Sequence, residues 1–166
     1  MTKSAFNRTM TSLDVPMIVV TASDGKRIAG CLVGFSGQSS IVPPRYTVYL
    51  SKLNHTYRVA QRSTHLMVHF LASDQLRLAR HFGELTGDDS SKFDGVRWTP
   101  GPDGSTPRLT ECHTYLWGRI DRRHFRDGDH AAYILEPLRT RVARGFEPFR
   151  FHKAQRIDPG HPLTEE

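Results

Sequence analysis

Polar side chains that suit an anion gather where one predicted strand gives way to a predicted helix. Ser51 and Lys52 end the strand, and Asn54, His55 and Thr56 open the helix. The first turn of a helix presents free N–H groups and a positive dipole end, so hydroxyl, amide and lysine groups beside it would suit a phosphate. The alternative is that Asn54 or Thr56 simply caps the helix. The segment matches neither the Walker A nor the GxGxxG pattern.

Two of the histidines have a spacing that suggests metal binding at first sight. His65 and His69 lie four positions apart, but that spacing brings two ligands together only on a helix. Their segment is predicted as a strand, where they would share a face with Met67. We therefore predict no metal site. His81, near the carboxyl end of a predicted helix, lies where a positive charge is favoured.

The tripeptide Gly128-Asp129-His130 follows a predicted tight turn and opens a strand. A histidine at such a position can meet a ligand, or it can be an ordinary polar residue beside a turn. The sequence contains no GxSxG elbow and no CxxC pair, so serine-hydrolase and thiol-redox chemistry have no support. Cys31 and Cys112 lie in strand-like runs, which is typical of buried, reduced thiols.

Charge and length limit the possible partners. The chain has 166 residues and a net charge of +6, which favours nucleic acid, membrane surfaces or phosphorylated small molecules. The basic segments 119–126 and 139–144 can equally be solvated strand faces.

No stretch approaches the roughly 18 unbroken apolar residues of a membrane helix, and the first ten residues lack a signal-peptide core. We expect a cytoplasmic protein.

The elements that must position these residues are mostly short strands. The pattern of apolar runs between turn residues predicts strands at 15–23, 27–35, 45–51, 65–72, 109–120 and 129–138. Asp24-Gly25 and the stretch 126–129 predict two tight turns. Helices are expected at 54–63 and at 73–82, the second closed by Gly83, with loops at 34–44, 86–96 and 99–107 and a possible last strand from Pro148. The fold class is mainly β, closed or sandwiched, with short helices.

Five motifs in order resemble one family over residues 13–151. They are "MIVVTASDG", "GCLVGFSGQSSIVPP", "YLSKLNHTYRVA", "LARHF" followed by "SSKFDGV", and "GDH". Together they resemble the flavin reductase family of FMN-binding split barrels. The resemblance implies a single domain over 1–166 and an NAD(P)H-dependent flavin reductase that transfers hydride from nicotinamide to FMN, or to FAD. It also implies a homodimer that supplies reduced flavin to a separate monooxygenase, with no nucleic-acid or membrane partner.

The resemblance also assigns roles to residues of this sequence. Gly34, Phe35, Gln38, Ser39 and Ser40 would line the isoalloxazine ring and ribityl chain. Ser51, Lys52, Asn54, His55 and Thr56 would hold the phosphate. Phe82, Lys92 and Phe93 would close the other side, and His130 would lie near the nicotinamide donor.

Three other functions fit part of the sequence. The protein could keep FMN or a deazaflavin bound and reduce another substrate, or it could bind flavin without turnover. A basic nucleic-acid-binding barrel would suit the charge, but it requires exposed aromatic residues among lysines and arginines on one sheet face, and no clear set is present.

Overall fold

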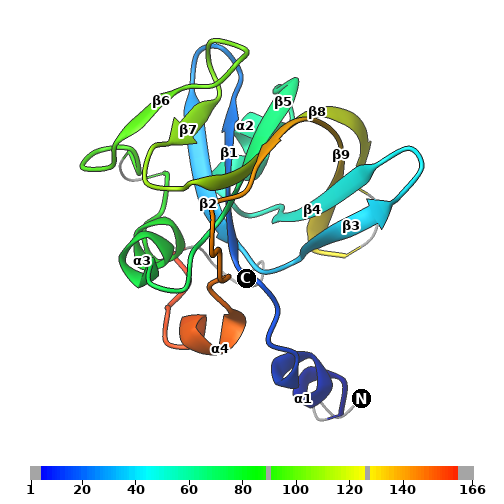
Figure 1. Ribbon diagram of the computed structural model, residues 1–166, viewed down its shortest axis with the longest axis vertical. Coiled ribbons are helices and arrows are strands. Elements are labelled where there is room, and N and C mark those ends of the chain that lie inside the picture. Colours follow the sequence, from blue (N-terminus) through cyan, green and yellow to red (C-terminus); the bar gives the residue numbers. More distant parts are fainter. Residues whose placement is uncertain (1–4, 89–90, 126–127, 161–166) are drawn as a thin grey trace.

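The computed structural model describes residues 5–88, 91–125 and 128–160, and its largest feature is a seven-stranded antiparallel sheet (Figure 1). The prediction of a mainly β fold with short helices is confirmed. The strands are β1 (Ile18–Ser23), β2 (Ile28–Val33), β3 (Ser36–Ser40), β4 (Arg45–Ser51), β5 (His65–Phe70), β6 (Trp98–Pro100), β7 (Pro107–Leu109), β8 (Thr114–His124) and β9 (His130–Arg141). The helices are α1 (Ala5–Ser12), α2 (His55–Ala60), α3 (Leu76–Glu84) and α4 (Phe151–Ala154).

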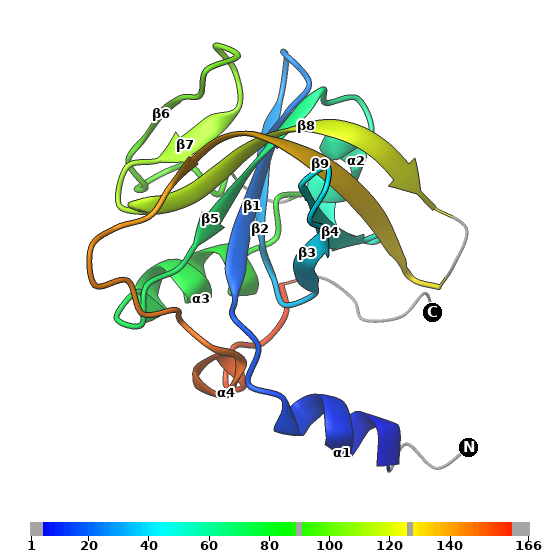
Figure 2. The same ribbon diagram turned by 45° about the vertical axis from the view of Figure 1, so that its right-hand side comes forward.

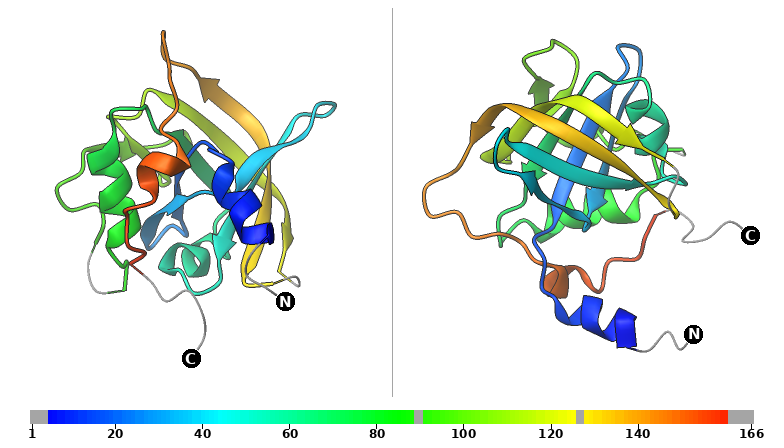
Figure 3. Two further views of the ribbon diagram at one scale, coloured as in Figure 1. Left: turned by 90° about the horizontal axis from the view of Figure 1, so that it is seen from below. Right: turned by 90° about the vertical axis from the view of Figure 1, so that its right-hand side faces the viewer.

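Strand order in the large sheet is β2-β1-β5-β8-β9-β4-β3, and β6 and β7 form a separate hairpin. Irregular register in the β8–β9 ladder, at Trp117/Gly118 and Ile120/Arg122, adds twist to the two longest strands. The sheet curls on itself as a result (Figure 3). The predicted turn between β1 and β2 is confirmed, with Gly25 at φ +84° and Asp24 accepting hydrogen bonds from the backbone N–H groups of Lys26 and Arg27.

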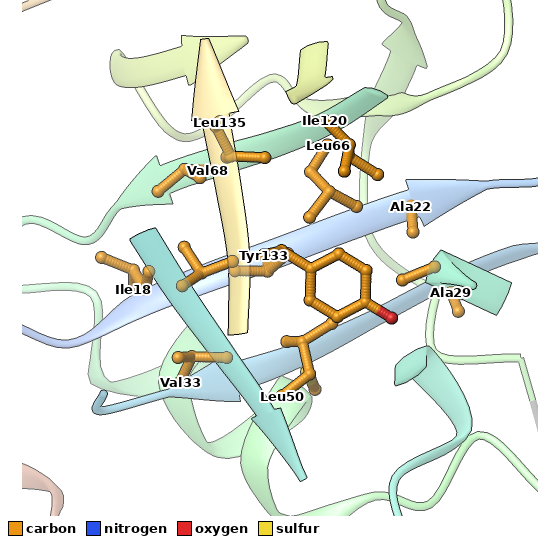
Figure 4. Packing of buried hydrophobic residues seen from close by; sticks show 14 of the residues in the cluster. Ile18, Ala22, Ala29, Val33, Leu50, Leu66, Val68, Ile120, Tyr133 and Leu135 are labelled. Carbon is orange, nitrogen blue, oxygen red and sulfur yellow. The ribbon is translucent and has the colours of Figure 1, made fainter. Parts of the chain in front are cut away.

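The inside of the curled sheet holds one hydrophobic core. Side chains from β1, β2, β4, β5, β8 and β9 meet there, and Val59 and Ala60 of α2 join them. Figure 4 shows the fully buried Tyr133 among these side chains. Asn54 accepts a hydrogen bond from the backbone N–H of Thr56, so the predicted capping of α2 is confirmed.

A second core covers the outer face of β1, β2 and β5. It joins Val19 and Leu32 of the sheet to Phe82 of α3, Leu109 of β7 and Phe149 of the C-terminal segment. The figures show α3 and the β6–β7 hairpin on this side of the molecule (Figures 1 and 2). We call β1, β2 and β5, with the elements that pack on their outer face, the covered half.

The outer face of β3, β4 and β9 has no such layer among the described residues. Tyr49 of β4 and Leu138 of β9 are 42% and 46% exposed. The β3–β4 hairpin projects from the body, and α1 extends away below it (Figure 1). We call β3, β4 and β9 the open half.

Several predicted boundaries are wrong. The stretch 34–44 is not all loop, because Ser36–Ser40 forms β3 by backbone pairing with β4, which needs no apolar side chains. The segment from Pro148 is not a strand: it makes isolated bridges and then forms α4. Gly83 does not end α3 but lies inside it, where an added Cβ would come within 2.7 Å of Ile157.

The remaining differences concern loops and turns. The expected loop 99–107 begins and ends in strands, because Trp98–Pro100 and Pro107–Leu109 pair as β6 and β7. The strand expected at 109–120 starts later, at Thr114. The turn predicted at 126–129 includes Arg126 and Asp127, and the motif "SSKFDGV" includes Ser90; these three residues lie outside the described part of the chain. Among the described residues, no helix is long and apolar enough to cross a membrane.

Candidate functional site

A cavity of about 770 Å³ lies where α1, the end of β2, β4, the start of β9, α3 and the C-terminal segment meet. Most of its lining is apolar. Polar groups are contributed by the side chains of Ser51, Asn54, Asp129 and His130, at the sequence motifs singled out above. Of the described residues that line it, none is a lysine or an arginine. A cavity of this size with few polar groups is typical of a small-molecule site.

Aromatic side chains form the wall of the cavity on the open half. The rings of Phe35 and His130 are 5.1 Å apart, and Phe35 is 61% exposed. The backbone N–H of Tyr49 donates to the carbonyl of Phe35 at 3.0 Å, which fixes the stretch after β2 against β4. Phenylalanine side chains are usually buried, so the exposure of Phe35 beside a cavity is unusual. Its ring offers a flat surface to a planar ligand.

His130 is held by its neighbours in the sheet. It lies opposite Ser51 in the β4–β9 ladder, and its Nδ1 is 2.9 Å from an Asp129 carboxylate oxygen. The His130 hydrogen bond lowers the pKa of Asp129, so the carboxylate is charged and accepts the Nδ1–H. Nε2 of His130 is then the nitrogen left for a ligand.

The floor of the cavity is tightly packed. The Phe82 ring is 1% exposed and lies on Gly30, where an added Cβ would come within 2.8 Å of a ring carbon. Nζ of Lys92 donates to the carbonyl of Phe82 at 2.9 Å, and His81 Nε2 lies 2.6 Å from the carbonyl of Lys92. These reciprocal contacts fix the last turn of α3 and with it the ring of Phe82.

Lys92 and Phe93 lie behind the cavity wall, not on it. Both are buried, Phe93 packs edge-on against Phe82 with ring centroids 5.8 Å apart, and burial lowers the pKa of Lys92. Cys31 lines the cavity and is buried, which raises the pKa of its thiol. Cys112 is also a free, buried cysteine, so the expectation for both thiols is confirmed.

Several polar groups of the segment expected to hold a phosphate are engaged with protein partners. Lys52 Nζ donates to the carbonyl of Gly128 at 2.6 Å, the Asn54 side chain caps α2, and Thr56 is 1% exposed. His55 Nδ1 lies 2.9 Å from Oδ1 of Asp88. Arg58, which the sequence reasoning missed, donates to the same oxygen of Asp88.

The predicted site residues divide into those that line the cavity and those that do not. Gln38, Ser39 and Ser40 lie on β3, where Gln38 donates to the carbonyl of Ser40 and Thr47 donates to Ser39. They do not line the cavity. The structure brings together six predicted residues on its lining: Gly34, Phe35, Ser51, Asn54, Phe82 and His130.

Other lining residues were missed by the sequence reasoning. Phe6, Met10 and Thr11 of α1 line the cavity, as do Tyr49 of β4 and Phe151 of α4. Phe6 and Met10 are four positions apart, which is a helical spacing that could have shown α1 to have an apolar face. Phe151 carried no comparable signal, because its segment was expected to be a strand.

His65 and His69, predicted to lie on one strand, are both on β5 but have different partners. His69 is fully buried, its Nδ1 lies 3.1 Å from the carbonyl of Val19, and its Nε2 accepts the N–H of Leu109 at 2.9 Å. His65 instead stacks on Trp117, with ring centroids 4.6 Å apart. His69 thus links β5 to β1 and β7.

A second cavity, of about 710 Å³, lies on the covered half beside the start of α3. Its charged lining residues balance, with Arg77, Arg97 and Arg144 against Asp74, Glu111 and Glu147. Arg77 and Glu111 form an ion pair at 2.7 Å. A balanced, partly paired lining gives no preference for an anion.

Comparisons with known proteins agree with the fold. The chain is 29% identical over 142 residues to the flavin-dependent monooxygenase reductase subunit HsaB of Rhodococcus jostii (strain RHA1), covering 83% of this chain and 68% of that protein. The NADH:FAD oxidoreductase SgcE6 of Streptomyces globisporus C-1027 superposes with a TM-score of 0.79 at 21% identity, covering 89% of this chain and 86% of that one. A flavin reductase domain protein from Arthrobacter sp. FB24 gives 0.78 at 21% identity, covering 97% and 96%.

The split-barrel fold expected from the resemblance is therefore confirmed. The sequence profile of the flavin reductase-like domain matches residues 10–157, which include the packed floor, the aromatic wall and the start of α2. On this match the chain belongs to the flavin reductase-like domain family.

Proposed function

We propose that the protein is an NAD(P)H-dependent flavin reductase that binds FMN in the cavity between α1, β4, β9 and α3. The observation that carries the proposal is the lining: a buried aromatic floor at Phe82, an exposed aromatic wall at Phe35, and His130 beside it. Family membership and the similarity to a monooxygenase reductase subunit support it.

The residues present fit a flavin. Phe35 offers exposed apolar surface to a flat ring system above the packed floor at Phe82, and the backbone of Gly34 can approach its edge without a side chain intervening. Ser51 and Asn54, on the polar side of the cavity, offer hydrogen bonds to a hydroxylated chain. Flavin, when bound, supplies the hydride-accepting chemistry, so the protein needs no nucleophile of its own.

The protein's part of the reaction is positioning. A hydride donor must be held with its reacting atom about 3–3.5 Å from the acceptor and without intervening water. The packed floor keeps one side of the cavity dry, while the open half leaves the other side accessible to a donor. His130 is the proposed contact of the nicotinamide, either touching the donor or relaying a proton through Nε2.

The proposed partners follow from the same features. HsaB is a reductase subunit of a flavin-dependent monooxygenase, and we propose that this chain likewise supplies reduced flavin to a separate monooxygenase. We further propose a homodimer formed across the open half, which would cover the exposed Tyr49 and Leu138. A cytoplasmic location suits access to NAD(P)H.

Anaerobic mixing with FMN and NADH, and then with NADPH, tests the function. Loss of the visible flavin absorbance on a timescale of seconds, catalysed by the protein, is the expected result, and the faster donor identifies the preferred nucleotide. Binding of FMN without reduction by either donor would instead favour a flavin carrier or another electron donor. Failure to bind FMN, FAD or riboflavin would overturn the proposal.

A further inference from the structure

Two side chains of α2, just after the cavity-lining Asn54, converge on one carboxylate. Asp88, in the segment after α3, accepts a hydrogen bond from Arg58, and His55 Nδ1 lies 2.9 Å from the same oxygen. The hydrogen bonds from Arg58 and His55 lower the pKa of Asp88, so the carboxylate is charged at neutral pH. The Asp88 side chain is 50% exposed, so a ligand can reach and displace it.

The position of this cluster matters because the described lining of the cavity offers a flavin phosphate no lysine or arginine. None of the described lining residues is a lysine or arginine, yet a flavin mononucleotide carries a phosphate of charge near −2. His55 directly follows Asn54, which lines the cavity, and Arg58 is three positions further along α2. Lys52, the other cation of the segment, is bound to the carbonyl of Gly128.

Asp88 and a flavin phosphate would therefore require the same two donors. A carboxylate that remained in place would repel the phosphate, and one that moved away would give up two charge-assisted hydrogen bonds. Either way, Asp88 weakens the binding of phosphorylated flavin. It has little effect on a flavin that lacks the phosphate.

We propose that Asp88 is an internal competitor for the flavin phosphate, which keeps FMN loosely bound and quick to leave. This inference rests on the proposed function, since it requires a flavin in the neighbouring cavity. A reductase that passes reduced flavin to another protein must release it, and a carboxylate at the phosphate site speeds that release without altering the ring-binding floor.

The segment that carries Asp88 has a second contact with α2, besides the carboxylate. Gly87 lies against the ring of His55, where an added Cβ would come within 3.2 Å of its atoms. Asp88→Asn keeps the size of the side chain and this backbone contact while removing the charge. The variant therefore separates competition from folding.

Fluorescence titrations with FMN and with riboflavin test the proposal in the wild type, D88N and D121N. Riboflavin lacks the phosphate, and Asp121 pairs with Arg45 at 3.0 Å away from the cavity, so D121N matches the change in net charge. We expect D88N to bind FMN about tenfold more tightly and to release it correspondingly more slowly. The reason is that the substitution removes one partly screened negative charge near the phosphate. We expect riboflavin binding, and both ligands in D121N, to stay within about twofold of the wild type.

The outcomes separate the two proposals. Unchanged or weaker FMN binding in D88N, with riboflavin still bound, would overturn the role of Asp88 alone. An equal gain for riboflavin would also overturn it, because the phosphate would not be involved. Failure of both ligands to bind any variant would overturn the proposed function together with this inference.

Discussion

The covered and open halves of the sheet differ in what lies on their outer faces. In the covered half, α3, the β6–β7 hairpin and the C-terminal segment bury β1, β2 and β5 from outside, and Val19 and Phe82 are almost completely buried. In the open half, Tyr49 and Leu138 remain partly exposed, as does Phe35 just before β3. The inner core is shared by both halves.

This difference separates stability from ligand binding. Burial of apolar surface is the main source of folding free energy, so the doubly covered strands should contribute more of it than the open ones. The cavity lies at the boundary: Phe82 reaches it from the covered half, and His130 reaches it from the open half. Mutations on the two sides should therefore have different kinds of effect.

The largest expected difference comes from two glycines in strands. At Gly30, an added Cβ would meet Phe82 at 2.8 Å and Thr21 at 3.2 Å, whereas at Gly37 nothing lies within 4 Å. We expect Gly30→Val to lower the free energy of unfolding by about 3 kcal/mol, the usual size of overpacking in a dense core. Gly37→Val should change it by less than about 0.5 kcal/mol. Urea denaturation measures both, and equal losses would contradict the division.

The next effect is a pH dependence that belongs to the covered half. Burial lowers the pKa of His69 to about 3, well below its ordinary value of 6.5. The unfolded chain therefore takes up a proton below pH 6.5 that the folded chain does not, and stability is lost as the pH falls. Near pH 5 the contribution of His69 to this loss should approach about 1.4 kcal/mol per pH unit. Denaturation midpoints of wild type and His69→Gln between pH 7 and pH 5 test it, since the variant should show a shallower slope.

In the open half, a histidine should affect activity more than stability. His130→Ala should slow anaerobic flavin reduction about tenfold or raise the required donor concentration by a similar factor. The unfolding free energy should stay within about 0.5 kcal/mol of the wild type. His113→Ala, at the second cavity, is the matched control and should leave reduction unchanged. Unaltered stopped-flow reduction in His130→Ala would remove His130 from the site.

The smallest effect is expected at the tip of the β3–β4 hairpin. Ile41 is 79% exposed, so Ile41→Ser removes almost no buried surface. Its unfolding free energy should lie within about 0.3 kcal/mol of the wild type. Thermal denaturation would show a clear loss only if the side chain is buried in a homodimer across the open half, and that loss would depend on protein concentration.

The parts of the molecule that could be predicted are those with local signals. Asp24-Gly25 specified its hairpin because positive φ favours glycine, and Asn54 specified the start of α2 because its side chain caps the helix. The resemblance drew attention to Phe82 and His130, and both line the cavity. The same resemblance predicted that Lys92 faces the ligand, but Lys92 packs behind Phe82.

What could not be predicted depends on contacts between distant segments. β3 forms because its backbone pairs with β4, although its side chains are small and polar. α1 and α4 reach the cavity only in the folded chain, and Asp88 meets Arg58 across 30 positions of sequence. The spacing of Phe6 and Met10 could show that α1 has an apolar face, but no local pattern shows which distant segments these elements contact.

Hydrogen exchange of the protein with and without FMN tests the division of the sheet most directly. The account predicts that FMN slows exchange at backbone amides in 34–35, 49–56 and 128–132, at the open side of the cavity. It predicts no change in 98–109, the β6–β7 hairpin. Protection confined to 71–78 and 110–114, around the second cavity, would contradict the account, because flavin would then bind on the covered half.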